Sequence, residues 1–471
     1  MESEAPGIFK GAPVVIKGLQ NNAQYNGQKG LVTAGPGDGG RFEVTLQTEK
    51  GYADAKVLSL KASNFQLDLD ALQEYVLQKR VEKARRDPPL EDLAVLWTKG
   101  KGLSAKSLTW QRLKVPDLGQ GEVLLRVDKF AFSHMALGYL MKGFTRTFGA
   151  YHNFYKHQEE NLYRSACWGF ATVMESTHPK VPVGTRLYGL MPPARFQVQP
   201  VGGTIPPGKK GEPAMVELAM EEIPFNLRRF QEMEVCEGLE PHLEDWIVAT
   251  KEIYTMAYYM DEQLLVDTGM ISCVLISCAS SKTALALAFC LRMREMRHVF
   301  GLTSKEHLEF ARSTDLYHQV FTYDDVDDLP SNHTVVYMDF KCDGELRQRI
   351  TLRMGTNLMY NMVLGPAVFQ KKMKDQVFEK RAREVLFDES SWRERRRMVA
   401  EVTKTGRNEK LKHSYQAFVD RMKKLIAVKH VTSNDFAAMY DALYNNAASP
   451  WEVHVCSLHC EDAAIDEIWK A

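Results

Sequence analysis

The residues best suited to chemistry lie in one short turn, which the sequence places between an apolar strand near 274–278 and a helix that reaches Phe289. Seven small or polar residues make up this turn. Free amides at the start of a helix, together with the helix dipole, favour a bound phosphate. We therefore predict that cofactor phosphates bind at this turn. The predicted contacts come from Ser277, Ala279, Ser280, Ser281, Lys282 and Thr283.

The turn allows two other interpretations. An ordinary structural turn between strand and helix remains open, because serine and alanine stand where a dinucleotide-binding turn usually has glycine. An ATP-binding loop is also suggested by Ser281-Lys282-Thr283, but such a loop needs glycines at the positions of Ser281 and Ile276. The sequence therefore disfavours an ATPase.

The end of the next predicted strand, near 299–303, indicates which dinucleotide would bind. An NAD-specific site places Asp or Glu about 20 residues after the turn, whereas this chain has Thr303-Ser304-Lys305. Two hydroxyls and a cation suit a 2′-phosphate, so the sequence predicts NADP(H). The alternative is that Ser304 caps a helix and Lys305 is solvated. Tyr323 and Asp339, which end the following two strands, complete the predicted cofactor-binding set.

These residues need a scaffold, and the pattern around them predicts an α/β fold. Residues 245–365 alternate apolar strands with helices, which is typical of a parallel sheet covered on both faces. Residues 91–244 carry strand signals separated by Pro and Gly, which indicates an all-β lobe. We predict that 366–447 is mostly helical and that the chain returns to strand near 453–458.

The N-terminal part reads as a separate small unit. Residues 10–66 alternate short β-branched runs with turn signals such as Asn26-Gly27, which predicts a small β-barrel. The run around Val15 and Tyr25 resembles SH3-like modules, which implies an interaction role. Residues 67–90 then show a 3.6-residue period and stop at Pro88-Pro89, so a linker helix is expected there.

The composition of the chain disfavours nucleic acid and membranes as binding partners. Sixty basic and 60 acidic residues give zero formal net charge, and 45% of residues are apolar. No global field would draw this chain to nucleic acid, and its apolar runs are too short to span a membrane. The first residues show no targeting pattern and the eight cysteines are scattered, which favours a reduced, cytoplasmic location.

From about Leu96 to Leu458 the chain resembles an uncharacterised family allied to the medium-chain dehydrogenase/reductases. The motifs that carry the resemblance lie at 168–176, 183–189, 277–284, 301–304 and 335–339. The resemblance implies a GroES-like β-barrel lobe, a Rossmann-like nucleotide-binding lobe and a reductase-type cofactor.

The resemblance also suggests catalytic candidates. Where the family carries Thr-x-Asn-Asn-x-x-Tyr, this chain keeps Ser133 and Tyr139 but loses both amides. Tyr139 could protonate a carbonyl or enolate oxygen as hydride arrives, or it could simply be packed. His134 is expected on a strand, facing away from Ser133. Asn226 lies in a segment that resembles one near the family's cleft and could orient the substrate.

Metal and nucleic acid are not expected. The only zinc-like cluster is His454, Cys456, His459 and Cys460, which chance and packing explain better than a tetrahedral site. The basic stretches at 371–374 and 393–397 are mixed with acidic residues, which is typical of solvated helices.

Two hypotheses follow from the sequence. The first is an NADP(H)-dependent, zinc-independent oxidoreductase that reduces an activated C=C bond, a quinone or a carbonyl. The second is a non-catalytic scaffold that binds proteins through its N-terminal barrel or helical insert. A homodimer is compatible with either hypothesis.

Overall fold

The computed structural model describes most of the chain. The described residues are 8, 10–37, 39–48, 55–68, 71, 91–98, 103–143, 162–207, 214–219, 228–233, 243–267, 271–363, 383–386 and 407–459. The 67–90 linker helix and the basic stretches at 371–374 and 393–397 lie almost wholly outside this set. Within it, no helix is long and apolar enough to cross a membrane.

The N-terminal unit is a five-stranded antiparallel sheet with the order β4-β3-β2-β1-β5. Alternating β-branched and polar residues produce it, because every second side chain points into a shared core. Val14, Val44 and Phe65 are buried in that core. The expected likeness to SH3 modules stays a prediction. The strands are β1 (Pro13–Ile16), β2 (Lys29–Ala34), β3 (Arg41–Leu46), β4 (Val57–Lys61) and β5 (Phe65–Leu67).

The predicted all-β lobe is a closed barrel. Strand β10 pairs with β11 on one side and with β8 on the other, which closes the order β10-β11-β14-β13-β12-β8. Closure leaves no free edge within the ring. The ring consists of β8 (Glu122–Ala131), β10 (Cys167–Ser176), β11 (Arg186–Met191), β12 (Phe196–Ile205), β13 (Met215–Leu218) and β14 (Arg229–Glu232).

Two further sets of strands attach to the barrel lobe. A three-stranded sheet consists of β7 (Leu108–Lys114), β6 (Glu91–Thr98) and β9 (Leu162–Tyr163). The C-terminal strands β21 (Ala427–Val431) and β22 (Glu452–Cys456) extend the barrel sheet, since β22 pairs with the end of β8. The strand that the sequence predicted near 453–458 is β22, and it joins the barrel lobe.

The second lobe is a six-stranded parallel sheet with the order β17-β16-β15-β18-β19-β20. Numbered from its first strand, this is the order 3-2-1-4-5-6 of dinucleotide-binding folds, in which ligands bind where the order reverses, here between β15 and β18. The strands are β15 (Cys273–Ile276), β16 (His298–Thr303), β17 (Gln319–Thr322), β18 (Val335–Asp339), β19 (Leu358–Val363) and β20 (Arg383–Leu386).

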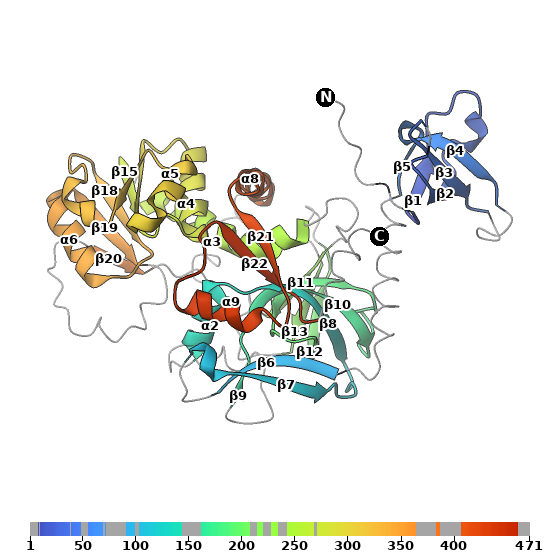
Figure 1. Cartoon of the computed structure of the whole chain (residues 1–471), viewed down its shortest axis with the longest axis horizontal. Coiled ribbons are helices and arrows are strands. Elements are labelled where there is room, and N and C mark those ends of the chain that lie inside the picture. The colour runs from blue at the N-terminus through green and yellow to red at the C-terminus, as the bar shows by residue number, and fades with distance from the viewer. Residues whose placement is uncertain are drawn as a thin grey trace.

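Helices cover both faces of this sheet. Val274 and Ile276 face a core with helices α3, α4 and α8, whereas Cys273 and Leu275 face a core with α6. Figure 1 shows α3 and α8 on the side of this lobe that meets the barrel. The helices are α2 (His134–Gly143), α3 (Leu243–Asp267), α4 (Lys282–Met293), α5 (Leu308–Ser313), α6 (Gly344–Met354), α8 (Arg407–Met422) and α9 (Phe436–Tyr444).

The range 366–447 contains more strand than the sequence predicted. Its described parts hold β20 and β21 besides the helices α8 and α9. Both strands are short and lie at sheet edges, where pairing with a neighbour outweighs a weak local preference. Helix still outweighs strand in the described parts of this range, so the structure adds two short strands that the sequence did not predict.

Candidate functional site

The predicted phosphate turn lies between β15 and α4, beside the reversal of strand order. Ser281 caps the helix: its hydroxyl accepts a hydrogen bond from the Ala284 amide at 3.3 Å. The amides of Lys282 and Thr283 precede the first bonds within the helix, and no other described group occupies them. These two amides are therefore donors that the turn can offer to a ligand.

Two of the predicted contacts serve the turn itself. The Ser277 hydroxyl accepts from the amides of Phe340 and Lys341 at 2.9 and 3.0 Å, which ties the turn to the loop after β18. The Ala279 amide donates to the Leu302 carbonyl at 2.9 Å. Ser277 and Ala279 are fully buried, so they hold the shape of the turn.

Tyr323 lies beside the same turn. Its hydroxyl oxygen accepts from the Cys278 amide at 3.2 Å, and the Lys341 ammonium stands 3.9 Å from the ring centroid. Cys278 has a φ of 51°, a left-handed conformation that glycine usually adopts. Burial raises the pKa of the Tyr323 hydroxyl. Tyr323 thus supports the backbone bend with a neutral phenol.

The ends of the first two strands meet through hydroxyl groups. The Ser280 hydroxyl lies 3.3 Å from that of Thr303 and 3.4 Å from Nδ1 of His307. Ser304 and Lys305 follow on the rim, where Ser304 is half-buried and Lys305 is exposed. The Ser304 side chain makes no cap bond to the short helix after it. Its hydroxyl and the Lys305 ammonium can therefore both face a ligand.

Lys282 carries a charge that the fold compensates poorly. Its ammonium donates to the Ser449 carbonyl at 3.4 Å. Burial lowers the Lys282 pKa to about 8, against a smaller opposing effect of Glu452. A desolvated cation at a helix start is a natural partner for a phosphate.

The charge of Asp339, unlike that of Lys282, is fully compensated within the fold. Its carboxylate is fully buried and forms an ion pair with Arg347, whose Nη2 and Nε lie 2.7 and 2.8 Å from Oδ2. The other oxygen accepts from the Cys342 amide at 2.7 Å and from the Tyr337 hydroxyl at 3.2 Å. These internal partners give Asp339 a structural role at the switch point.

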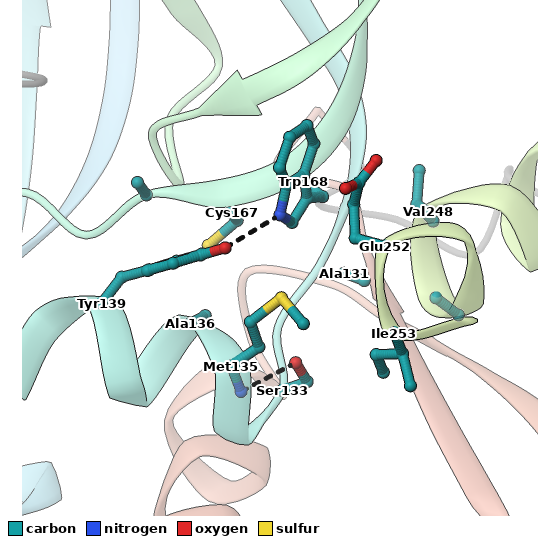
Figure 2. Close-up of a pocket in the computed structure, with 12 residues that line it drawn as sticks. Ala131, Ser133, Met135, Ala136, Tyr139, Cys167, Trp168, Val248, Glu252 and Ile253 are labelled. Atoms are coloured by element: carbon teal, nitrogen blue, oxygen red, sulfur yellow. Dashed lines mark hydrogen bonds between the residues drawn. The ribbon is translucent and has the colours of Figure 1, made fainter. Parts of the chain in front are cut away.

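A pocket lies between α2, β10 and α3, and it brings two predicted catalytic residues together. Ser133, Tyr139, Trp168 and Glu252 are among its lining residues (Figure 2). The Trp168 indole N–H donates to the Tyr139 hydroxyl oxygen at 3.3 Å. The cavity volume is about 10 Å³, which is the room that one water needs.

Ser133 and His134 do not lie on a strand, so that prediction was wrong. Strand β8 ends at Ala131, and the chain turns into helix α2 at His134. The Ser133 hydroxyl accepts from the Met135 amide at 3.2 Å, which is the bond of a helix cap. The good helix formers that follow Ser133 outweigh the strand that precedes it. The His134 ring lies 3.3 Å from Oδ1 of Asn446 and does not line the pocket.

Trp168, Glu252 and His307 were not predicted as site residues. The sequence held a weak signal for Trp168 only, because the motif at 168–176 belongs to the family resemblance. Asn226 and Cys460 lie outside the described residues, so neither is placed. Among the residues that are described, no group of three or more His, Cys, Asp or Glu could hold a metal ion.

Solved structures offer distant similarities. CurA from Vibrio vulnificus in complex with NADPH matches with a TM-score of 0.48 and 10% identity, over 78% of this chain and 99% of that one. The CurF ER cyclopropanase from the curacin A biosynthetic pathway matches with a TM-score of 0.48 and 14% identity, over 78% and 100%. Curated proteins give no match.

The family comparison covers more than half of the chain. Its match begins at the end of strand β8, spans the pocket and the parallel sheet, and ends just before β22. The chain therefore belongs to the family described as "Protein of unknown function (DUF2855)", which matches residues 130–449.

Proposed function

We propose that this protein binds NADP(H) and reduces an activated C=C bond, a quinone or a carbonyl without zinc. One observation carries the proposal. Where the strand order reverses, the α4 amides and Lys282 stand beside a strand end that presents Ser304 and Lys305. The first group suits a diphosphate, and the second suits a 2′-phosphate.

The residues of the turn fit such a cofactor in the chemistry of their donors. The backbone donors lie at the start of α4, and cations lie at Lys282, Lys305 and Lys341, of which Lys341 also pairs with Asp343 at 3.3 Å. The carboxylate closest to the switch point, Asp339, is neutralised by Arg347 and so would repel a phosphate little. When bound, NADPH would supply hydride, and the chain would have to position the substrate and provide a proton.

Tyr139 is the proposed proton donor. Its hydroxyl oxygen accepts the Trp168 N–H, which would stabilise the negative charge left on oxygen once the proton has gone to the substrate. Ser133 acts on Tyr139 indirectly, because its cap bond fixes the start of the helix that carries Tyr139. Asn226 stays a proposal from the family resemblance, as a residue that orients the substrate.

A second candidate is supported by the small pocket and by the loss of both family amides. A cavity of about 10 Å³ admits no substrate without opening. A non-catalytic scaffold that contacts proteins through its N-terminal sheet, with or without homodimer formation, would need no larger space.

Titration with NADPH and NADH, followed by nicotinamide fluorescence, tests the first candidate. We expect NADPH to bind more tightly than NADH and Lys305→Glu to remove that preference. Lys180→Glu is the matched control, because it reverses a charge on an exposed lysine of the barrel lobe. Equal binding of both nucleotides would overturn the NADP(H) assignment. If neither nucleotide binds, the non-catalytic scaffold is the candidate that remains.

Turnover separates reduction from simple binding. A panel of quinones and α,β-unsaturated carbonyls would be tested for NADPH oxidation. Tyr139→Phe should lower kcat by about 10²-fold or more if Tyr139 provides the proton, with NADPH affinity unchanged. An unchanged kcat in this variant would remove Tyr139 from catalysis.

A further inference from the structure

We propose that His134, Lys282 and His454 form a binding site for an anionic group, such as a phosphate or a carboxylate, between the two lobes. The three residues come from α2, α4 and β22. The site goes beyond the nucleotide-binding turn, because two of its three cationic groups lie in other elements. It also does not depend on whether the protein is a reductase.

The connection between α9 and β22 brings the first two groups together. Asn446 contacts the His134 ring at 3.3 Å, and the Ser449 carbonyl accepts from Lys282 at 3.4 Å. Three residues of chain span at most about 11 Å, so His134 and Lys282 meet the same short segment.

The third group follows within a few residues. The Ser449 carbonyl that binds Lys282 also accepts from the Glu452 amide at 3.3 Å. His454 lies two residues farther along β22, on the same face as Glu452, because side chains alternate along a strand. Lys282, Glu452 and His454 therefore meet at the start of this strand.

Positive charge exceeds negative charge at this place. Glu452 is the carboxylate that faces the cluster, and it already pairs with Lys429 at 3.5 Å. Burial, the charges of Lys282 and Lys429, and finally that of His134 lower the His454 pKa against the opposing effect of Glu452. Because their pKa values are lowered, both imidazoles are mostly neutral at pH 7. At mildly acidic pH they gain protons, and three cations then share one carboxylate that has its own partner, so an anion would relieve their repulsion.

The cluster is also open to a ligand. Burial among neighbouring atoms lowers the His134 pKa, yet its side chain is exposed to solvent. Lys282 and His454 are half-buried. Solvent therefore reaches all three side chains, and at mildly acidic pH their surplus positive charge attracts anions.

Calorimetric titration with inorganic pyrophosphate at low ionic strength and mildly acidic pH tests the proposal with charge changes of opposite sign. His454→Gln should weaken binding by about fivefold, and Glu452→Gln should tighten it by a similar factor. Lys424→Gln removes an exposed charge from the same half of the chain and should change nothing. A variant that merely unfolds cannot tighten binding, so Glu452→Gln decides.

The proposal is overturned if pyrophosphate does not bind, or if Glu452→Gln fails to strengthen binding. The same titration in saturating NADPH identifies the source of the anion. Competition would assign the site to the cofactor diphosphate, and simultaneous binding would assign it to an acidic group of the substrate. If NADPH itself does not bind, the proposed function fails while the pyrophosphate result stands.

Discussion

The two sides of the strand-order switch point each carry a charged side chain, but only one of the two forms an ion pair with another described residue. On the β18 side, Asp339 is fully buried and paired with Arg347. On the β15 side, Lys282 is half-buried and donates to the Ser449 carbonyl at 3.4 Å. A buried charge that is paired within the fold becomes a large cost when its partner is removed, so it has a structural role. A desolvated charge with weak compensation can still gain from a ligand.

The largest expected effect tests the structural side. Arg347→Met should lower the free energy of unfolding by about 3–5 kcal/mol, because Asp339 would remain buried without its counter-charge. Urea unfolding measures the loss. The double variant with Asp339→Asn should recover part of it, because the orphaned charge is then removed. If Arg347→Met alone loses no stability, the ion pair is not structural, and Asp339 becomes a candidate for ligand binding again.

Next comes the close packing beneath the turn. A Cβ added at Gly301 would stand 2.8 Å from the Cβ of Ala279 and 3.1 Å from the Tyr317 ring. Gly301→Ala should therefore cost about 1–3 kcal/mol and weaken NADPH binding by shifting the turn. Gly203→Ala is the control, because a Cβ there meets nothing within 4 Å. Equal effects of the two variants would contradict the close approach.

Lys282→Met tests the side of the switch point assigned to the ligand. It should reduce NADPH affinity by about tenfold at neutral pH, through the lost bond to a phosphate. The free energy of unfolding should not fall, because the fold disfavours the charged form of Lys282. Fluorescence titration and urea unfolding give the two numbers, and a loss of stability without a loss of affinity would reverse the assignment.

The pH dependence of NADPH binding follows from the same residue. The Lys282 pKa lies at about 8 in the free protein, and a bound phosphate would raise it. Affinity should therefore be full below pH 8 and fall above it, by at most about tenfold per pH unit. The Lys282→Met variant should lack this fall. Affinity that increases with pH would exclude charged Lys282 as a ligand contact.

The smallest effect concerns the helix cap. Ser281→Ala should cost about 1 kcal/mol of stability, because the Ala284 amide loses its acceptor. Ser281→Asp restores a cap but places a negative charge beside the proposed diphosphate. It should keep stability and lose NADPH binding. If Ser281→Asp binds NADPH as well as the wild type does, the phosphate does not sit at this turn.

Much of the architecture follows from patterns within single segments. The continuous apolar run at Cys273, Val274 and Leu275 indicates that β15 is covered on both faces, and the turn chemistry at 277–283 marks the start of α4. Local patterns gave the wrong element where a strand changes directly into a helix. Ser133 ends a strand and caps a helix, so two neighbouring preferences compete and the chain shows no period long enough to decide between them.

By itself, the sequence determined most of the kinds of element, their order and the turn for which we propose phosphate binding, because these depend on neighbours within a few residues. Only the tertiary structure decided which of the candidate site residues make their hydrogen bonds within the protein. The Ser277 hydroxyl accepts from amides 63 and 64 residues away. The fold likewise brings Arg347 to Asp339. The meeting of His134, Lys282 and His454 was equally hidden, because contacts across more than 100 residues depend on how the two lobes pack together.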